Sequence, residues 1–306
     1  MMPSEVFVPE SATGGFVTVG NFDGVHRGHQ SMLAIVRQHA DERSLPTVVV
    51  TFDPHPINVL KPEVNLPRLS SVHQRIRLLQ RYGADEVVVL PVTAGLLNMP
   101  PEQFFCAIVR DQLHAVGMFE GPDFHFGRDR TGDTEVLRGL CNENGIELTV
   151  ISPILTDQDM ISSTMIRRLI SKGKLTDAVE LLGHPYSLFG NVVKGAGRGQ
   201  DLGFPTANVA GVEVMLPADG VYAGVTKIAG ASYRVAVSIG PNPTFSDQSH
   251  KVECHVLDFS GNLYEEAFTV DLLAEIRNLH PFKDAETLKT QIAADVTRCR
   301  NIIALQ

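Results

Sequence analysis

The 306-residue chain has no tryptophan, only four cysteines, no long apolar run and no excess of basic side chains. The cysteines are solitary, without a C-x-x-C pair, so the sequence predicts neither a disulfide framework nor a cysteine-rich zinc site. The apolar run at 87–97 contains Pro91 and is too short to span a bilayer. The net charge is −9 and both halves are acidic, which argues against general binding to nucleic acid or an anionic membrane.

Length and composition predict a soluble, globular protein. With 43% hydrophobic residues, the chain is long enough for two domains that each bury a core. Residues 1–5 lack the charged and apolar regions of a secretory leader, and solitary cysteines suit a reducing compartment. We therefore expect a cytoplasmic protein that binds anionic ligands through local clusters of side chains.

Strand-like and helix-like segments alternate from residue 16 to about residue 182. Apolar, β-branched stretches predict buried strands at 16–19, 48–52, 86–90 and 147–151. Periodicity and end signals, such as the Ser71 and Gln74 capping box, predict helices at 31–40, from 71, at 101–114 and at 134–143. Strands separated by helical crossovers predict a doubly wound parallel sheet with ligands at the carboxyl ends of the strands.

The local composition of the chain changes after Gly183-His184-Pro185, where Gly and Pro recur every few residues. Short runs predict antiparallel strands at 190–193, 221–228, 233–239, 252–257 and 268–272. An amphipathic helix at about 285–303 should pack on the small barrel that these strands form. The sequence therefore predicts an α/β domain at 1–184 and a β domain at 185–306.

The loop between the strand at 16–19 and the following helix is typical of a nucleotide-phosphate site. Helix N-termini favour anions, and glycines let a phosphate approach the backbone. His26 and His29 are three residues apart, so both imidazoles can donate hydrogen bonds to a triphosphate. A metal half-site or plain turn chemistry are the alternatives. The other candidate residues of this loop are Gly20, Asn21, Phe22, Asp23, Gly24 and Gly28.

A second candidate phosphate site begins the helix after residue 161. The hydroxyls of Ser162, Ser163 and Thr164, the backbone N–H groups and Arg167 can converge on phosphates. The alternative interpretation is an ordinary Ser/Thr helix cap.

Two further loops are expected near the carboxyl ends of the strands. The segment 51–56 leaves the second strand, although it could be a proline-rigid turn. The segment 121–132 holds two arginines, aromatic residues and glycines, so it can clamp a phosphate and stack a ring, or it is a solvated turn. Their candidate residues are Phe52, Asp53, His55, Pro56, Asp123, Phe126, Arg128 and Arg130.

The β domain carries its own candidate site. A Gly-rich, basic loop at 190–199 precedes the segment Leu202-Gly203-Phe204-Pro205-Thr206-Ala207-Asn208. Such a loop is weak evidence by itself, and P-T-A-N could be a turn entering a strand. Glu253 alternates with apolar neighbours in a predicted strand, where a carboxylate is either a solvated residue or a base.

These motifs resemble two enzyme families in one chain. The G-N-F-D-G-V-H-x-G-H loop, the D-F-x-F-G segment from 123 and I-S-S-T-x-x-R at 161–167 are similar to those of bacterial FMN adenylyltransferases of the H-x-G-H type. P-T-A-N and V-E-C-H-V-L-D-F at 252–259 resemble riboflavin kinase. Their order over about residues 14 to 300 resembles bacterial bifunctional riboflavin kinase/FAD synthetases.

The resemblance implies a Rossmann-like nucleotidyltransferase domain and a kinase barrel that together convert riboflavin to FMN and FAD. ATP would be the co-substrate of both steps. In the first domain, the two histidines, the hydroxyls and Arg167 would stabilise pyrophosphate, while the loops at 52–56 and 123–130 would hold FMN. Many relatives have Arg where this chain has Met165, which removes one possible phosphate contact and affects the rate.

In the barrel, the resemblance implies that Glu253 is the base and that Thr206 and Asn208 hold Mg²⁺. The implied ATP contacts are Gly195, Gly197, Arg198, Gly203 and Pro205. The implied flavin contacts are Asn242, Thr244 and Arg277.

Two rival functions use the same motifs. One is a nucleotidyltransferase for another phosphorylated vitamin, and the other is a flavin- or nucleotide-sensing regulator. The expected partners are small molecules, namely riboflavin, FMN and ATP, and not nucleic acid or membrane. The sequence makes no prediction of oligomeric state.

Overall fold

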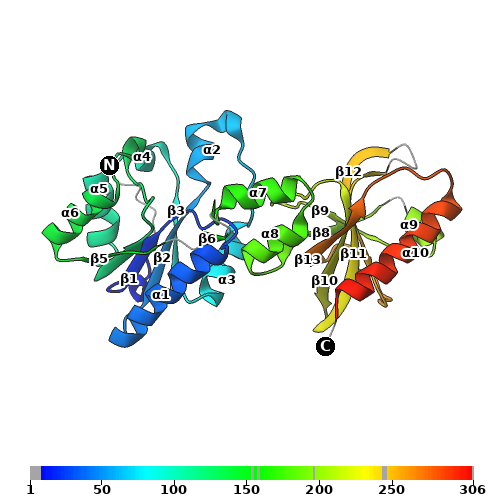
Figure 1. Ribbon diagram of the computed structural model, residues 1–306, viewed down its shortest axis with the longest axis horizontal. Helices are drawn as coiled ribbons and strands as arrows, with labels where there is room; N and C mark the ends of the chain where they lie inside the picture. Colours follow the sequence, from blue (N-terminus) through cyan, green and yellow to red (C-terminus); the bar gives the residue numbers. More distant parts are fainter. Residues whose placement is uncertain (1–7, 153–154, 157–158, 196, 243–246, 305–306) are drawn as a thin grey trace. The chain divides into compact units, whose positions relative to one another are not determined.

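The computed structural model describes residues 8–152, 155–156, 159–195, 197–242 and 247–304. The chain forms two compact units, Met1–Ser162 and Ser163–Gln306 (Figure 1). The boundary predicted after residue 184 separates two expected functional domains rather than two compact units, and it stays a prediction. None of the described helices is long and apolar enough to span a membrane.

The first unit is built on a five-stranded parallel sheet in the order β3-β2-β1-β4-β5. Its strands are β1 (Phe16–Val19), β2 (Thr47–Asp53), β3 (Glu86–Pro91), β4 (Gly117–Glu120) and β5 (Glu147–Val150). The sheet order reverses at β1, so the first loop leaves the sheet at its topological switch point. The predicted doubly wound α/β fold is confirmed.

Helices cover both faces of this sheet. Helices α1 (Arg27–Arg43) and α3 (Val72–Arg81) pack on the face that includes Val49. The opposite face holds α4 (Ala94–Leu97), α5 (Pro101–Phe104), the π-helix η3 (Phe105–Arg110) and α6 (Thr134–Asn144). Leu33, Val36 and Ala40 are the buried face of α1, as the period predicts. Ser71 and Gln74 form the predicted capping box of α3.

The predicted helix at 101–114 begins at Pro101 as expected but ends earlier, at Arg110, and its second half is a π-helix. The N–H of Asp111 donates to the Cys106 carbonyl at 2.9 Å, and that of Leu113 donates to the Ile108 carbonyl at 3.0 Å. These bonds span five residues instead of four, so the helix widens into η3 and ends at Arg110.

The remaining elements of the first unit are short. They are η1 (Glu10–Ala12), α2 (Pro56–Leu60), η2 (Pro62–Val64), η4 (Arg128–Arg130), β6 (Leu155–Thr156) and β7 (Asp159–Met160).

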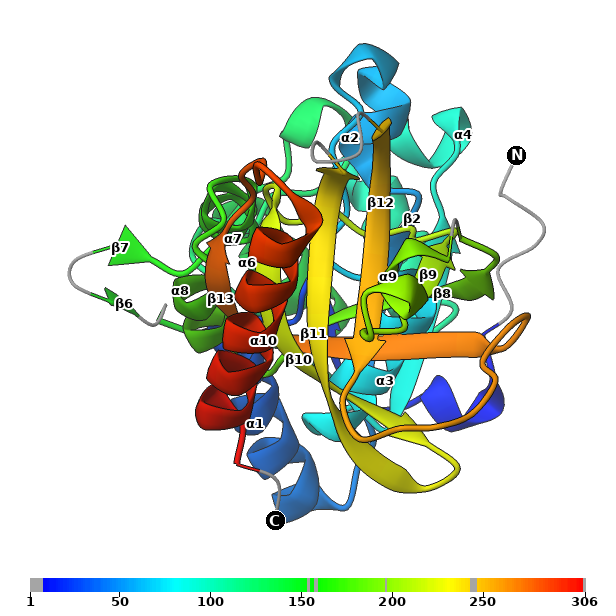
Figure 2. The ribbon, with the colours of Figure 1, turned by 90° about the vertical axis from the view of Figure 1, so that its right-hand side faces the viewer.

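The second unit is a closed barrel with strand order β10-β11-β12-β9-β8-β13 (Figure 2). Its strands are β8 (Tyr186–Val193), β9 (Ala207–Ala210), β10 (Gly220–Ile228), β11 (Ala231–Asn242), β12 (Asp247–Val256) and β13 (Ala267–Asn278). Several strands are longer than predicted. The sequence prediction of a small antiparallel barrel with a C-terminal helix is confirmed, because α10 (Ala285–Ile302) packs on β10, β11 and β13.

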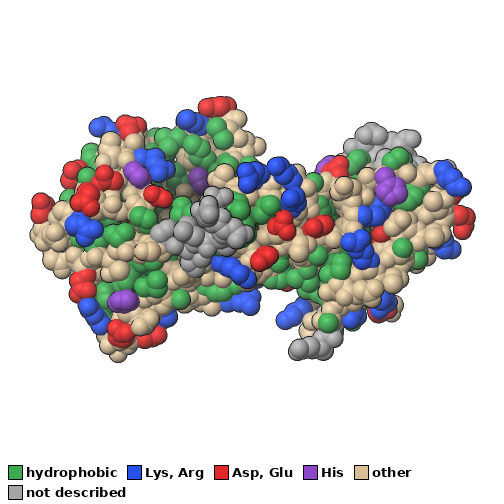
Figure 3. Space-filling model, viewed as in Figure 1, with side chains coloured by type: hydrophobic (Ala, Val, Ile, Leu, Met, Phe, Trp, Pro, Cys, Tyr) green, Lys and Arg blue, Asp and Glu red, His purple; other side chains and the backbone are tan. Residues whose placement is uncertain are grey.

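Two helices that precede the barrel in sequence also belong to this unit. They are α7 (Ser163–Ser171) and α8 (Leu175–Leu182), and α8 packs against β13. Both the N–H and the hydroxyl of Thr176 donate to the carboxylate of Glu275, each at 2.8 Å. Over the face of the molecule in Figure 3, acidic and basic side chains are interspersed on both units.

Candidate active sites

The two histidines of the first unit lie side by side at the start of α1. His26 is the N-cap residue, and His29 lies in the first turn. Their rings stack with centroids 3.7 Å apart and an interplanar angle of 19°, so both imidazoles lie together, as the spacing predicts. A side chain at Gly28 would place its Cβ 3.2 Å from the ring of His26. Glycine at this position therefore avoids a close contact with the His26 ring.

His29 is held in its neutral form by its surroundings. Burial, together with the nearby His26 and Arg75, lowers the pKa of His29 well below its usual value. Its Nδ1 atom is buried and has no hydrogen-bond partner among the described residues. A neutral imidazole keeps one N–H, so His29 can donate a hydrogen bond to a phosphate oxygen without adding a buried charge.

Asp23 shapes the phosphate loop from within. Its carboxylate accepts hydrogen bonds from the N–H groups of Leu69 and Ser70, at 2.9 to 3.0 Å, and from the Ser70 hydroxyl at 3.0 Å. The Ser70 hydroxyl oxygen in turn accepts from the N–H of Gly24 at 3.1 Å. Asp23 is only 3% exposed, so these bonds fix the loop against the segment before α3.

Arg75 is a buried charge that the sequence analysis missed. It is 4% exposed, and its Nη1 donates to the Asn21 carbonyl, the Thr51 hydroxyl and the Phe52 carbonyl, each at 2.9 Å. The side chain thereby ties the loop after β1 to the end of β2. A sequence signal exists, because Arg75 is one helical turn before buried Leu79, on the face of α3 where apolar residues are expected.

The segment after β2 borders the same edge of the sheet. Phe52 and Asp53 end β2, and Asp53 lies 3.6 Å from the guanidinium of Arg68. His55 caps α2, since its Nδ1 accepts from the N–H of Ile57 at 3.2 Å, and Pro56 is the first residue of that helix.

The loop after β4 also leaves this edge. Asp123, Arg128 and Arg130 are exposed. Phe126 is 7% exposed and lies in the core beside Phe104, stacked on Phe124 with ring centroids 5.4 Å apart. The structure therefore gives Phe126 a packing position, and its predicted flavin contact stays a prediction.

The hydroxyl-rich segment spans the point in the sequence where the first unit ends and the second begins. Within the first unit, the carbonyl of Ile161 lies 3.7 Å from the position that a Cβ at Gly28 would take, so this segment reaches the start of α1. Ser162 ends the first unit. Ser163 begins α7, Thr164 is exposed in its first turn, and Arg167 is 9% exposed.

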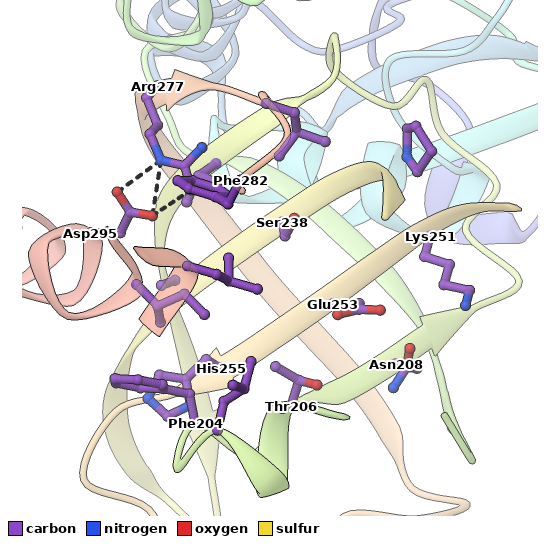
Figure 4. Close-up of a pocket in the computed structure, with 18 of the residues that line it drawn as sticks. Phe204, Thr206, Asn208, Ser238, Lys251, Glu253, His255, Arg277, Phe282 and Asp295 are labelled. Atoms are coloured by element: carbon purple, nitrogen blue, oxygen red, sulfur yellow. Dashed lines mark hydrogen bonds and ion pairs between the residues drawn. The ribbon is translucent and has the colours of Figure 1, made fainter. Parts of the chain in front are cut away.

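A pocket opens on the outer face of the barrel (Figure 4). Val252, Cys254 and Val256 of β12 are buried, whereas the alternate residues Lys251, Glu253 and His255 line the pocket. Glu253 is directly opposite Ser238 of β11 and Asn208 of β9, and all three line the pocket. A carboxylate is thus placed between a hydroxyl and an amide from neighbouring strands.

Two glycines bring a loop against the polar end of this pocket. A Cβ at Gly195 would lie 2.1 Å from the Asn208 side-chain nitrogen, and one at Gly199 would lie 2.5 Å from the Phe204 carbonyl oxygen and 3.1 Å from the Thr206 hydroxyl. At Gly199 the close atom is a backbone carbonyl, so a side chain there would force the loop away, whereas at Gly195 the Asn208 side chain would have to move. Thr206 and Asn208 supply oxygen donors beside Glu253, which is the donor type that suits Mg²⁺.

Of the remaining kinase candidates, Gly197 and Arg277 line this pocket. Gly203 precedes Phe204 with a φ of +87°. The Pro205 carbonyl accepts a hydrogen bond from Nδ1 of His255 at 2.8 Å. Arg198 begins α9 (Arg198–Asp201), Asn242 ends β11, and Thr244 lies outside the described residues. Arg277 and Asp295 line the far end of the pocket.

Comparison with known proteins identifies both units. The family model described as FAD synthetase matches residues 8–165, and that of riboflavin kinase matches residues 182–303. A bifunctional riboflavin kinase/FMN adenylyltransferase from Pseudomonas fluorescens is 36% identical over 292 residues, which cover 95% of this chain and 94% of that protein. The protein of the same name from Escherichia coli K12 is 32% identical over 295 residues, with the same coverage of both chains.

A solved structure resembles this chain over both units. The crystal structure described as a macrolide-efflux protein from Streptococcus pneumoniae aligns with a TM-score of 0.87 and 31% identity, over 97% of this chain and 96% of that one. Together the matches define an FAD synthetase unit joined to a riboflavin kinase unit. The chain belongs to the bifunctional riboflavin kinase/FMN adenylyltransferase family, which confirms the resemblance read from the motifs.

Proposed function

We propose that the barrel phosphorylates riboflavin to FMN and that the parallel-sheet unit converts FMN to FAD, with one ATP used in each step. The observation that carries the proposal is the row Ser238, Glu253 and Asn208 in the barrel pocket, because it places a carboxylate beside oxygen donors. The stacked His26 and His29 at a helix N-terminus supply the corresponding support in the first unit.

In the kinase step, Glu253 accepts the proton of the terminal ribityl hydroxyl. The hydroxyl oxygen then attacks the γ-phosphorus of ATP, the bond to the β-phosphate oxygen breaks, and ADP leaves. Thr206 and Asn208 would hold Mg²⁺, which when bound supplies positive charge for the phosphates. The glycines at 195, 197 and 203, with Arg198 and Pro205, form the ATP side of the proposed site, and Asn242, Thr244 and Arg277 its flavin side.

In the adenylyl-transfer step, a phosphate oxygen of FMN attacks the α-phosphorus of ATP and pyrophosphate leaves. His26 and His29 donate hydrogen bonds to the phosphates as negative charge develops on the leaving oxygen. The loop at 20–24 and the hydroxyls at 162–164, with Arg167, complete the proposed ATP site. Orientation of the two substrates supplies much of the rate, since the FMN phosphate is already ionised at neutral pH.

The FMN side of this site is proposed at the loops that follow β2 and β4. Asp53, His55 and Pro56 lie after one strand, and the exposed Asp123, Arg128 and Arg130 lie after the other. Both loops leave the carboxyl edge of the sheet, where ligands of doubly wound sheets bind. A cytoplasmic location is part of the proposal, because all four cysteines are free thiols and ATP is the co-substrate.

Incubation of the full-length protein with riboflavin, ATP and Mg²⁺, followed by separation of the flavins, tests the proposal. FMN and FAD should both form, with ADP and pyrophosphate as co-products. Adenylylation of FMN without phosphorylation of riboflavin would instead favour a nucleotidyltransferase with an accessory barrel. Riboflavin that binds and stays unchanged would favour a sensor.

A further inference from the structure

Among the described residues, two ion pairs join α10 to the barrel, and they differ in their exposure to solvent. Arg277 of β13 pairs with Asp295 of α10, and the two side chains are 17% and 6% exposed. Arg300 pairs with Asp258, and these side chains are 42% and 62% exposed. The first pair lines the pocket described above, whereas the second is not among its lining residues.

The buried pair is held by several hydrogen bonds. Nε of Arg277 lies 3.0 Å from both oxygens of Asp295, and Nη2 lies 2.8 Å from Oδ2. The Gln291 amide donates to Oδ1 of Asp295 at 2.9 Å, which fixes the carboxylate from the same helix. The plane of the Arg277 guanidinium therefore has little freedom to turn.

Arg277 in turn supports an aromatic side chain. Its guanidinium carbon lies 5.5 Å from the centroid of the Phe282 ring, and Nη1 donates to the Asn278 carbonyl at 3.0 Å. Asp295, Arg277 and Phe282 thus form a continuous stack at one end of the pocket (Figure 4). We name this stack the Asp295 wall.

The Asp295 wall lies at the apolar end of the pocket. Leu279, Leu288 and Ile292 line the pocket beside it, whereas Thr206, Asn208 and Glu253 line the other end. A substrate with a flat aromatic ring system and a reactive hydroxyl on a polar chain fits these two ends in one orientation. This step rests on the proposed function, in which the substrate is riboflavin.

We propose that Asp295 is a positioning residue for riboflavin, acting through Arg277 and Phe282. Without that carboxylate, the largely shielded guanidinium loses its ion-pair partner and keeps only the Asn278 carbonyl, so it turns toward water or another acceptor. Phe282 then loses the cation that supports one face of its ring. The ring end of riboflavin binds less tightly, while the groups around Glu253 stay in place.

The test uses Asp295→Asn in the full-length protein, with Asp258→Asn as the matched control from the exposed ion pair of the same helix. Riboflavin binding is measured by quenching of flavin fluorescence, and FMN formation by steady-state kinetics. In Asp295→Asn, the riboflavin Kd and KM should rise about tenfold, which is the scale of a cation–π contact that is partly shielded from water. The kcat, the KM for ATP and the conversion of supplied FMN to FAD should change less than about twofold, and Asp295→Glu should restore part of the riboflavin affinity.

Three results would overturn the proposal. They are an unchanged riboflavin Kd in Asp295→Asn, an equal loss in Asp258→Asn, or a loss confined to kcat. If Asp295→Asn does not fold, Phe282→Leu removes only the supported ring and must raise the riboflavin Kd to a similar extent. A wild-type protein that makes no FMN would refute the proposed function itself, whereas normal riboflavin affinity in an otherwise active Asp295→Asn would refute only the role of Asp295.

Discussion

The candidate site residues of the two units lie on different parts of the backbone. In the parallel-sheet unit, the candidate residues lie beyond the strand ends, in the loops and first helical turns that follow β1, β2 and β4. In the barrel, the central row of Ser238, Glu253 and Asn208 lies on the strands themselves, at paired positions of β11, β12 and β9. The first arrangement needs a buried polar network to hold its loops, and the second obtains its order from the strand ladder.

This difference decides how each site responds to mutation. A loop site depends on buried residues such as Asp23 and Arg75, whose side chains form hydrogen bonds with the backbone of the loop or of its neighbours. A strand site is held by backbone pairing, so single side chains can change with less effect on their neighbours. Variants in the barrel should therefore separate chemistry from structure more cleanly than variants in the first unit.

The largest expected effect is at Glu253. Glu253→Gln keeps the size of the side chain but cannot accept the hydroxyl proton, so riboflavin phosphorylation should fall by about 10² to 10⁴. Supplied FMN should still become FAD. The measurement is the rate of FMN production at saturating riboflavin over a range of Mg²⁺-ATP concentrations.

Thr206→Ala and Asn208→Ala serve as the comparison for Glu253→Gln. These two substitutions should weaken the binding of Mg²⁺-ATP, so raised Mg²⁺ or ATP should restore part of the rate of FMN formation. Raised Mg²⁺ or ATP should not restore the rate of Glu253→Gln. Wild-type turnover in Glu253→Gln would remove Glu253 from the role of base. Unchanged kinetics in all three variants would remove the kinase site from this pocket.

In the first unit, the largest effect is expected at His29. His29→Ala removes one preorganised donor, so FAD formation should fall by about 10² to 10³ while FMN formation continues. Rates of both products from riboflavin, in one reaction, measure the two activities together. Equal loss of both would point to misfolding or to a shared site.

The contrast between loops and strands also explains what the sequence could predict. Loop motifs such as 20–29 are continuous in sequence, so strand, turn and helix signals meet in one short segment. The pocket row Ser238, Glu253 and Asn208 comes from three strands, and only the family resemblance marked Glu253 and Asn208. Asp295 was missed because its partner Arg277 lies on another element. The widening of the helix at η3 has no local signal in its residues.

A smaller effect is expected at Arg75, which tests whether the loop site depends on its buried network. Arg75→Met removes the donor that joins the Asn21 carbonyl to the Phe52 carbonyl, and only the Thr51 hydroxyl, at 3.0 Å, still donates to Asn21. FAD formation should therefore fall about tenfold with FMN formation retained. Removal of this positive charge should also raise the pKa of His29, which shifts the pH profile of FAD formation to higher pH.

The exposed Arg77 of the same helix provides the matched control for Arg75. Arg77→Met should leave the rate of FAD formation and its pH profile unchanged. Equal effects of the two substitutions would show that the charge of α3 matters, rather than the hydrogen bonds of Arg75.

The smallest expected effect is on stability, at a buried carboxyl of the first unit. Glu120 is 2% exposed, and its Oε1 accepts a hydrogen bond from the N–H of Val19 at 2.8 Å, so it joins β4 to the end of β1. Burial raises the pKa of Glu120 well above its usual value, and the bond from Val19 only partly opposes this. The folded protein therefore keeps a proton that the unfolded chain releases above about pH 4.5.

This proton makes the free energy of unfolding fall as the pH rises from the unfolded pKa of Glu120 to its folded pKa, by up to about 1.4 kcal/mol per pH unit. Glu120→Gln can still accept from Val19 but does not titrate, so its stability relative to wild type should increase between about pH 5 and about pH 8 in urea denaturation. Glu147→Gln on neighbouring β5 is the control. The pKa of Glu147 is lowered by Arg43, so its carboxylate favours folding above its unfolded pKa, and its removal should not give this gain. Parallel stability curves for wild type and Glu120→Gln over this pH range would show that Glu120 is ionised inside the folded unit.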